Sequence, residues 1–341
     1  MTPSSGPRVV VWDTTYACPL RCVHCYSESG RRPHRQLAPE DMITVADRII
    51  ELRPTLVDLT GGEPLLVNGI TEIAARIRDA GITAAIYTGG WPLRAELLPA
   101  LARSANRVIV SVDGPDAATH DRIRGRAGSF DRAMAALAML EEDGRIPFGI
   151  DSTVMRSNLD GLPRFCTEIA PRFPSMRRIS FKGMAPVGLA SRMSFADAEL
   201  LTDEQMAEFG SPAFAERLRA LAPGSVHIDV ETNLGIRMLP SARDTTGFET
   251  MFVEPDGEVR GLTVYEGTVG SLLREPASVL WERCRQRWDD PVVVEALGSV
   301  RTMRDWAVAA RRIDYHFGSP EVRARIDARP EYLPVLVAGR G

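Results

Sequence analysis

The sequence predicts an α/β protein with a parallel sheet and outer helices, shaped as a barrel or partial barrel and followed by a smaller α+β part. Three observations lead to this prediction. Six strand-like runs alternate with helical patterns up to Lys182. Polar and glycine-rich motifs fall at the ends of the predicted strands, and the alternation stops beyond Lys182. An open doubly wound sheet remains an alternative.

The elements of the first part follow from the spacing of apolar residues. Val9–Trp12 is a short apolar run, and the helix expected after it places Met42, Ala46 and Ile49 on one face. Similar patterns define the later units. The expected strands are residues 9–12, 56–59, 82–87, 107–112, 148–154 and 178–182. The expected helices are residues 39–52, 70–80, 93–102, 130–143 and 159–170.

In the second part the predicted strands and helices no longer alternate regularly. A long helix is expected at residues 203–221, and the turn sequence Glu254-Pro255-Asp256-Gly257 indicates a hairpin. The other expected strands are residues 226–230, 249–253 and 258–262, and the other expected helices are residues 277–286, 292–296 and 302–312. The sequence therefore predicts two domains, residues 1–185 and residues 186–341, of which the second covers the active site of the first.

The composition excludes several classes of protein. The net charge is -4 and no basic run is present, which argues against a nucleic-acid surface. The sequence has no run of about 18 apolar residues, so it predicts no membrane span. Residues 1–8 lack the apolar core of a signal peptide, so we expect a cytoplasmic protein. In that compartment the five cysteines are not expected to form disulfides.

Unusual residues gather where the predicted strands end. In barrel-like α/β folds the active site lies at the carboxyl ends of the strands. Glycine-rich turns there allow the backbone to approach a ligand closely. The motifs at these ends are Asp13, Gly61-Gly62-Glu63, Thr88-Gly89-Gly90, Ser111-Val112-Asp113-Gly114 and Lys182, the single lysine of the chain.

Three of the five cysteines lie close together after the first strand. Cys18, Cys22 and Cys25 form a CxxxCxxC pattern on one short loop. Three thiolates can bind three irons of a cubane cluster and leave the fourth iron open for another ligand. A zinc site is the alternative, but it normally needs a fourth protein ligand. Three buried core cysteines are the other alternative.

This loop resembles the signature of the radical S-adenosylmethionine (SAM) superfamily, CxxxCxΦC, with His24 at the aromatic position Φ. Residues 12–17 resemble the lead-in to that signature, and the resemblance covers roughly residues 8–185. It implies a partial (β/α)6 TIM-type barrel that binds one [4Fe–4S] cluster on Cys18, Cys22 and Cys25. It also implies that cleavage of SAM gives a 5′-deoxyadenosyl radical, which abstracts a hydrogen atom from the substrate.

The strand-end motifs resemble the SAM-binding motifs of the superfamily. Gly61-Gly62-Glu63 resembles the GGE motif, whose carboxylate suits the ammonium group of SAM. Ser111 and Asp113 resemble the SxDG motif near the ribose, although turn chemistry explains Asp-Gly equally well. The residues that the resemblance assigns to cofactor binding are His24, Tyr26, Gly61, Gly62, Glu63, Pro64, Thr88, Ser111, Asp113, Ser152 and Val154.

The second part resembles a SPASM or twitch extension in residues 251–260, 269–273 and 279–281. Such extensions usually carry cysteines for auxiliary clusters, the first of them just after the hairpin. Residues 260–263 contain no cysteine. The resemblance therefore implies a degenerate SPASM/twitch-like extension without an auxiliary cluster.

Two further residues are candidates for catalysis. Lys182 ends the sixth strand, where it would bind the SAM carboxylate or the substrate, or remain a surface or salt-bridge lysine. Cys284 would donate a hydrogen atom to a substrate radical, as a thiol does in radical SAM epimerases. Packing is the alternative for Cys284, as it is for Cys166.

We expect a radical SAM enzyme that acts on a small substrate in bacterial specialised metabolism, such as a sugar, nucleoside or antibiotic precursor. Epimerisation, rearrangement or C–C bond formation are the expected reactions. A maturase for a ribosomally made peptide is the alternative, and a non-catalytic iron–sulfur sensor is an alternative of another class. The expected partners are the small-molecule substrate and an electron donor such as flavodoxin or ferredoxin, with no nucleic acid and no membrane.

Overall fold

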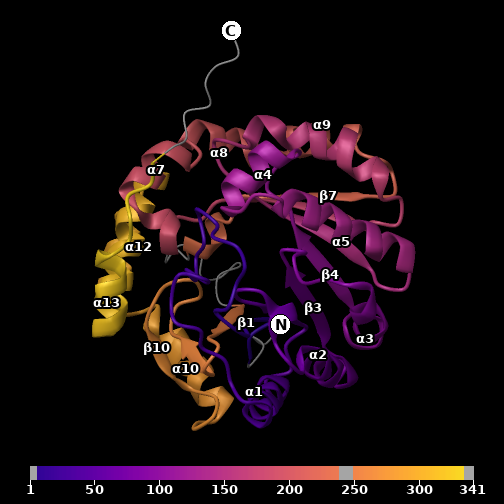
Figure 1. Ribbon diagram of the computed structural model, residues 1–341. Coiled ribbons are helices and arrows are strands. Elements are labelled where there is room, and N and C mark those ends of the chain that lie inside the picture. The colour runs from indigo at the N-terminus through magenta and orange to yellow at the C-terminus, as the bar shows by residue number, and fades with distance from the viewer. Residues whose placement is uncertain (1–5, 238–248, 334–341) are drawn as a thin grey trace.

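The computed structural model describes residues 6–237 and 249–333 (Figure 1). The strands are β1 (Val9–Asp13), β2 (Leu56–Thr60), β3 (Thr83–Thr88), β4 (Arg107–Ser111), β5 (Phe148–Val154), β6 (Arg178–Gly183), β7 (His227–Glu231), β8 (Thr250–Val253), β9 (Glu258–Arg260) and β10 (Thr268–Ser271).

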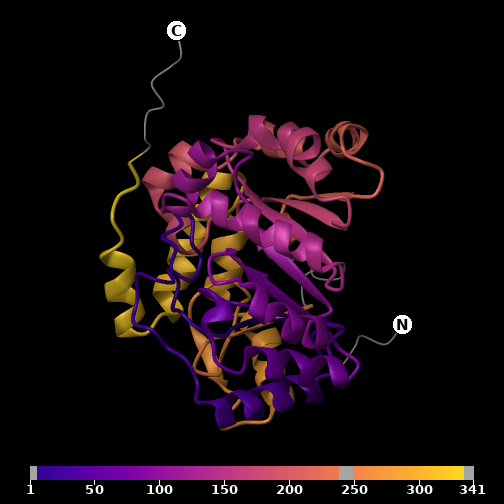
Figure 2. The same cartoon turned by 45° about the vertical axis from the view of Figure 1, so that its right-hand side comes forward.

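The helices lie outside the sheet (Figures 1 and 2). They are α1 (Pro39–Glu51), α2 (Ile70–Asp79), α3 (Leu98–Ser104), α4 (Ala117–Arg124), α5 (Ser129–Asp143), α6 (Leu162–Arg164), α7 (Met193–Glu199), α8 (Asp203–Phe209), α9 (Pro212–Leu221), α10 (Ala277–Arg287), α11 (Pro291–Gly298), α12 (Met303–Phe317) and α13 (Pro320–Asp327). No helix in the described ranges is long and apolar enough to cross a bilayer.

The strands of the described residues form one sheet in the order β10-β9-β8-β1-β2-β3-β4-β5-β6-β7. Strands β1 to β6 are parallel neighbours and give the six units of the predicted partial barrel, so this prediction is confirmed. Strand β7 adds to β6, and β8 adds to the far side of β1, both in parallel. The part beyond residue 185 thus continues the sheet at both edges, while the domain boundary there stays a prediction.

Strand alternation decides which side chains reach the inside of the barrel. Successive side chains of a strand point to opposite faces. On β5, Asp151 and Thr153 face the interior, while Ser152 and Val154 are buried on the helix side. Helix α1 shows the matching helical pattern, because Met42, Ala46 and Ile49 are buried as expected. Ile43, by contrast, is 43% exposed.

Several elements differ from the sequence prediction. The helix expected at residues 203–221 is two helices, because Ser211 caps α9 by accepting a hydrogen bond from the Phe214 N–H, with Pro212 in its first turn. The helix expected at residues 159–170 is a chain of short turns, with a π-helical turn at Phe165–Ile169. Elements α4, α7, α13 and β10 were not predicted.

Candidate active site

A cavity of about 360 Å³ lies at the carboxyl ends of the parallel strands. This volume is within the range of small-molecule sites. The ends of β2 to β6 line it, and Phe252 and Val264 of the extension complete its wall. The predicted residues that line it are Cys18, Cys22, His24, Cys25, Tyr26, Gly61, Gly62, Glu63, Thr88, Ser111 and Lys182.

The cysteine loop presents three thiols to this cavity. The Cys18 sulfur accepts a hydrogen bond from the Leu20 N–H at 3.4 Å, and the Cys25 sulfur lies 3.5 Å from the Ser27 hydroxyl. Within the described residues, no three His, Cys, Asp or Glu side chains converge on one ion. Three thiols on one loop are a donor set that a cubane iron–sulfur cluster can take, with one iron left for another ligand.

Cys18 and Cys22 of this loop are half-buried, which makes their thiolate forms unfavourable unless positive charge is near. Burial raises the pKa of the Cys18 and Cys22 thiols above their ordinary value. Thiolates at these positions therefore need positive charge nearby. The Arg124 guanidinium, 3.9 Å from the Cys22 sulfur, supplies part of it. Cluster irons would supply the rest, so the donor set fits a cluster held by three cysteines.

Asp113 lies beneath this loop and does not line the cavity. Its Oδ2 accepts from His24 Nε2 at 3.0 Å and pairs with Arg124 Nε at 2.8 Å, and its Oδ1 accepts from the Thr153 N–H at 2.8 Å. Burial would raise the pKa of Asp113, but Arg124 and His24 outweigh it and hold that pKa well below its usual range. Asp113 therefore lies outside the cavity lining with protein partners on both carboxylate oxygens, and direct binding of the cofactor by Asp113 stays a prediction.

Helix α4 supports the cysteine loop, and its role was missed in the sequence. The Arg21 N–H donates to the Arg124 carbonyl at 3.0 Å, and the Val23 N–H donates to the Ile123 carbonyl at 2.9 Å. A side chain at Gly125, which has a φ of 67°, would place its Cβ 2.3 Å from the Arg21 oxygen. The cap residue Asp116, which accepts from the Thr119 N–H, and Gly125 at the other end are the signals that predict this helix.

The Gly61-Gly62-Glu63 turn is joined to the cysteine loop by its backbone. The N–H groups of Gly62 and Glu63 donate to the carbonyls of Thr15 and Ala17 at 2.7 and 2.9 Å. A Cβ on Gly62 would lie 2.2 Å from the Ala17 oxygen, so only glycine permits this approach. The two loops therefore hold each other in place.

Glu63 is a buried carboxyl at the edge of the cavity. It accepts hydrogen bonds from the Thr88 hydroxyl at 2.8 Å and from the Gly89 N–H at 2.9 Å. Burial raises the pKa of Glu63 to about 7. An ammonium group bound in the cavity would favour the ionised form, which is what the predicted contact with SAM requires. Pro64 starts the short turn behind Glu63 and does not line the cavity.

The ends of β5 and β6 form a polar wall. The Lys182 ammonium lies 2.7 Å from an Asp151 carboxylate oxygen, and both residues line the cavity. Burial would lower the pKa of Lys182, but Asp151 outweighs it and raises that pKa. Lys182 thus faces the site as expected, although its role stays a prediction. The side chains of Ser152 and Val154 point away from the cavity, because strand alternation turns them toward the helices.

Cys284 lies outside the cavity. It is buried on α10, and its thiol donates to the Arg260 carbonyl oxygen at 3.3 Å. Burial raises the pKa of this thiol to about 12. Helix packing directs the sulfur at backbone of the extension, which favours the packing alternative, and the hypothesis that Cys284 donates a hydrogen atom to a substrate stays a prediction. Cys166 is likewise buried in the core, as the packing alternative predicts.

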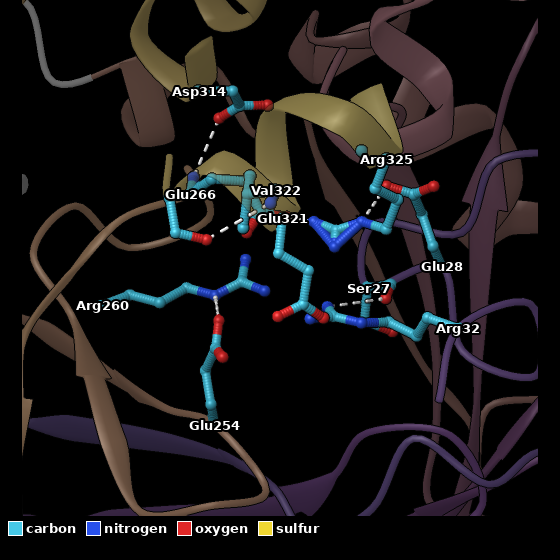
Figure 3. A network of polar contacts seen from close by, with 12 residues as sticks. Ser27, Glu28, Arg32, Glu254, Arg260, Glu266, Asp314, Glu321, Val322 and Arg325 are labelled. Atoms are coloured by element: carbon cyan, nitrogen blue, oxygen red, sulfur yellow. Dashed lines mark hydrogen bonds and ion pairs between the residues drawn. The ribbon is translucent and has the colours of Figure 1, made fainter. Parts of the chain in front are cut away.

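A buried ion network joins the extension to the cysteine loop (Figure 3). Arg260, in the region after the hairpin where the resemblance implies a cluster cysteine, pairs with Glu254 at 2.9 Å. Arg325 of α13 pairs with Glu266 at 2.6 Å and with Glu28 of the cysteine loop at 3.2 Å. Arg329 reaches Glu28 at 2.8 Å. Residues near the end of the chain therefore hold the segment that follows Cys25.

Comparisons with known proteins agree with this geometry. The family model described as the radical SAM superfamily matches residues 12–162. An AdoMet-dependent heme synthase from Methanosarcina barkeri is 28% identical over 295 residues, which cover 82% of this chain and 83% of that protein. Mycofactocin maturase MftC from Mycolicibacterium smegmatis is 33% identical over 176 residues, which cover 51% of this chain and 44% of that protein.

Solved structures share the fold. Streptococcus suis SuiB, solved bound to the precursor peptide SuiA, matches with a TM-score of 0.60 at 15% identity. The match covers 96% of this chain and 75% of SuiB. The structure of anSMEcpe with bound AdoMet matches with a TM-score of 0.55 at 13% identity and covers 94% of both chains. The match to both proteins includes the extension.

The fold and the site together define an α/β partial barrel that presents three thiols and a glycine-rich carboxylate turn to one cavity. The chain carries a radical SAM domain and is an enzyme of the radical SAM superfamily. It binds a [4Fe–4S] cluster and SAM.

The buried carboxylate of Glu28 is expected to be essential for stability. In Glu28→Gln, Arg325 and Arg329 lose a charged partner inside the protein, which costs about 3–5 kcal/mol. We expect a lower melting temperature and a lower iron content after anaerobic reconstitution. The matched control is Glu295→Gln, which removes the exposed pair with Arg312 and costs less than about 1 kcal/mol. Equal melting temperatures for the two variants would contradict the role of the network.

Cys284→Ala distinguishes packing from hydrogen donation at that residue. Because the thiol contacts only protein in the described residues, we expect product formation within about twofold of the wild type once folding is matched. Loss of product with continued formation of 5′-deoxyadenosine, measured by mass spectrometry, would instead support the hydrogen-donor hypothesis.

Proposed function

We propose that this enzyme is a maturase that modifies a side chain of a ribosomally made peptide. The observation that carries the proposal is the match to SuiB, a structure bound to its precursor peptide, over 96% of this chain including the extension. The 33% identity to mycofactocin maturase supports the same reading. These relatives favour a peptide over the sugar, nucleoside or antibiotic precursor expected from the sequence.

In this proposal the residues of the chain divide into two groups. Cys18, Cys22 and Cys25 hold the cluster, and Glu63 with Thr88 and Ser111 receives SAM. When bound, the cluster would supply one electron, and SAM would supply the radical that takes a hydrogen atom from an unactivated C–H bond. The protein's own task is to bind both ligands, orient the target hydrogen and exclude water.

The substrate side of the cavity has two kinds of wall. Asp151, Lys182, Thr153 and Asn233 supply charged and hydrogen-bonding groups. The other wall is apolar and is formed by the extension and by the segment after β6. Its residues are Met184, Ala185, Val187, Phe252 and Val264. The polar groups fix the orientation of a side chain, and the apolar ones exclude water around it.

Heme synthesis is a second candidate. The heme synthase of Methanosarcina barkeri aligns with 82% of this chain, and the mycofactocin maturase aligns with 51%. The longer alignment includes most of the extension, which lines part of the cavity. For either substrate we propose a cytoplasmic reaction, with reduction by a flavodoxin or a ferredoxin.

Coexpression with candidate precursor peptides tests the proposal. Short peptides encoded beside the gene are produced with the enzyme, and their mass is measured under anaerobic conditions. We expect a mass change that is absent with Cys22→Ala. Heme formed from Fe-coproporphyrin III, without change in any peptide, would favour the second candidate and overturn the first.

Glu63→Gln tests the assignment of the SAM-binding carboxylate. The amide keeps the hydrogen-bonding shape but loses the charge that faces the SAM ammonium. We expect the dissociation constant for SAM to rise at least about tenfold, since a hydrogen bond between charged groups contributes about 1.5–3 kcal/mol. Binding to the reconstituted protein is measured by isothermal titration calorimetry.

The same carboxylate predicts a pH dependence. The pKa of Glu63 in the free protein is about 7, so Glu63 is mostly neutral at pH 6 and mostly ionised at pH 8. Affinity for SAM is therefore expected to rise with pH across this interval in the wild type and to stay flat in Glu63→Gln. A parallel rise in both proteins would assign the effect to another group.

A further inference from the structure

Four exposed arginines surround the outside of the cysteine loop. Arg21 donates to the carbonyls of Cys18 and Leu20, at 2.9 and 2.8 Å. Arg31 donates to the Cys22 carbonyl at 3.1 Å. Arg126 donates to the Pro19 carbonyl at 2.8 Å. Its guanidinium also stacks over the Trp91 ring at 3.6 Å, and Arg132 lies over the same ring at 5.5 Å.

We call these residues, Arg21, Arg31, Arg126, Arg132 and Trp91, the arginine face. The four arginines are all exposed. None of them forms an ion pair with a carboxylate in the part of the chain that the structure describes. Other exposed arginines do form such pairs, for example Arg145 with Asp143 and Arg312 with Glu295.

The charge of this face is unusual for this protein. The chain as a whole carries a net charge of -4, so an uncompensated positive cluster is not a consequence of general basicity. The charge of Arg31 also acts on the neighbouring Arg192. Burial, together with the nearby Arg31 and Arg329, lowers the pKa of Arg192 to about 10. Four exposed guanidiniums without a carboxylate partner in the described residues give this face a positive charge, which attracts an acidic partner.

The arginine face is separate from the substrate cavity but adjoins the cluster ligands. None of its residues lines the cavity. Two of its guanidiniums are bonded to the carbonyls of Cys18 and Cys22 themselves. A protein bound to this face would lie one peptide group from two of the cluster ligands. Short distance is what electron transfer needs, because the tunnelling rate falls steeply with distance.

We propose that the arginine face is the docking surface for an acidic one-electron donor protein of the flavodoxin or ferredoxin class. In the step that it serves, the reduced donor loses one electron and the oxidised cluster gains it, with no bond made or broken. The half-buried Trp91 ring, under the Arg126 guanidinium, supplies an apolar surface between the charges. This inference requires radical SAM chemistry and does not depend on whether the substrate is a peptide.

The test compares charge-reversed variants of the reconstituted enzyme. In Arg126→Glu/Arg132→Glu the dissociation constant for a purified bacterial flavodoxin is expected to rise at least about tenfold at low salt. The rate of cluster reduction by flavodoxin hydroquinone in the presence of SAM, followed by electron paramagnetic resonance, is expected to fall similarly. For the wild type, the affinity for flavodoxin and the rate of cluster reduction by flavodoxin should both fall steeply as the ionic strength rises. Reduction by dithionite should be unchanged.

The matched control is Arg103→Glu/Arg172→Glu. These two arginines are also exposed. They lie at the ends of helical segments that run away from the cavity, and therefore at the opposite end of the barrel. The control thus changes the net charge by the same amount, far from the arginine face. Arg132→Glu alone separates docking from loop damage, because in the described part of the chain Arg132 contacts the Trp91 ring and makes no hydrogen bond to the cysteine loop. The proposal would be overturned if all variants bound flavodoxin, and likewise a ferredoxin, with equal affinity. It would also be overturned if Arg132→Glu lost reduction by dithionite in parallel with reduction by flavodoxin.

Discussion

The structure depends on holding one short loop, with three thiols, in a fixed shape. A loop of this kind has no internal secondary structure, so its backbone groups must be bonded by neighbours. The glycine-rich turn after β2 bonds the carbonyls of Thr15 and Ala17, and the end of α4 bonds the N–H groups of Arg21 and Val23. Beneath them, Asp113 joins His24 to Arg124. The strand-end motifs therefore build the loop as well as the cavity.

The extension takes part in the same support from the other end of the chain. Glu28, just after the third cysteine, is buried and paired with two arginines from residues 325–329. Gly188 and Leu189 pack against the backbone of Tyr26 and Cys25. Because ion pairs inside a protein lose much stability when one partner is removed, the extension and the cluster site are coupled energetically. Closure of the cavity by Phe252 and Val264 depends on the same arrangement.

The site has two functional sides with different chemistry. The inner side combines a carboxylate for SAM with a wall of charged and apolar groups, which suits a side chain held out of water. The outer side is positive and adjoins the cysteine carbonyls, which suits the arrival of an electron. Placing the two on opposite sides of one loop lets the electron donor and the substrate bind at the same time. The relatives of similar sequence include maturases and heme synthases, whose named products differ.

Sequence alone determined the chemistry that is local in the chain. The spacing of Cys18, Cys22 and Cys25, the turn before Glu63 and the six parallel strands are patterns of neighbouring residues, and the structure has the loop, the turn and the strands where they were predicted. Tertiary structure decided what depends on direction and on distant contacts. Asp113 and Arg124 are 11 residues apart in sequence, yet their pairing beneath the loop requires α4 to fold back. Strand alternation, which turns Thr153 inward and Ser152 outward, and helix packing, which turns Cys284 away from the cavity, are set by the register and the core. The physical reason is that a motif specifies which groups are present, whereas packing specifies where each group points.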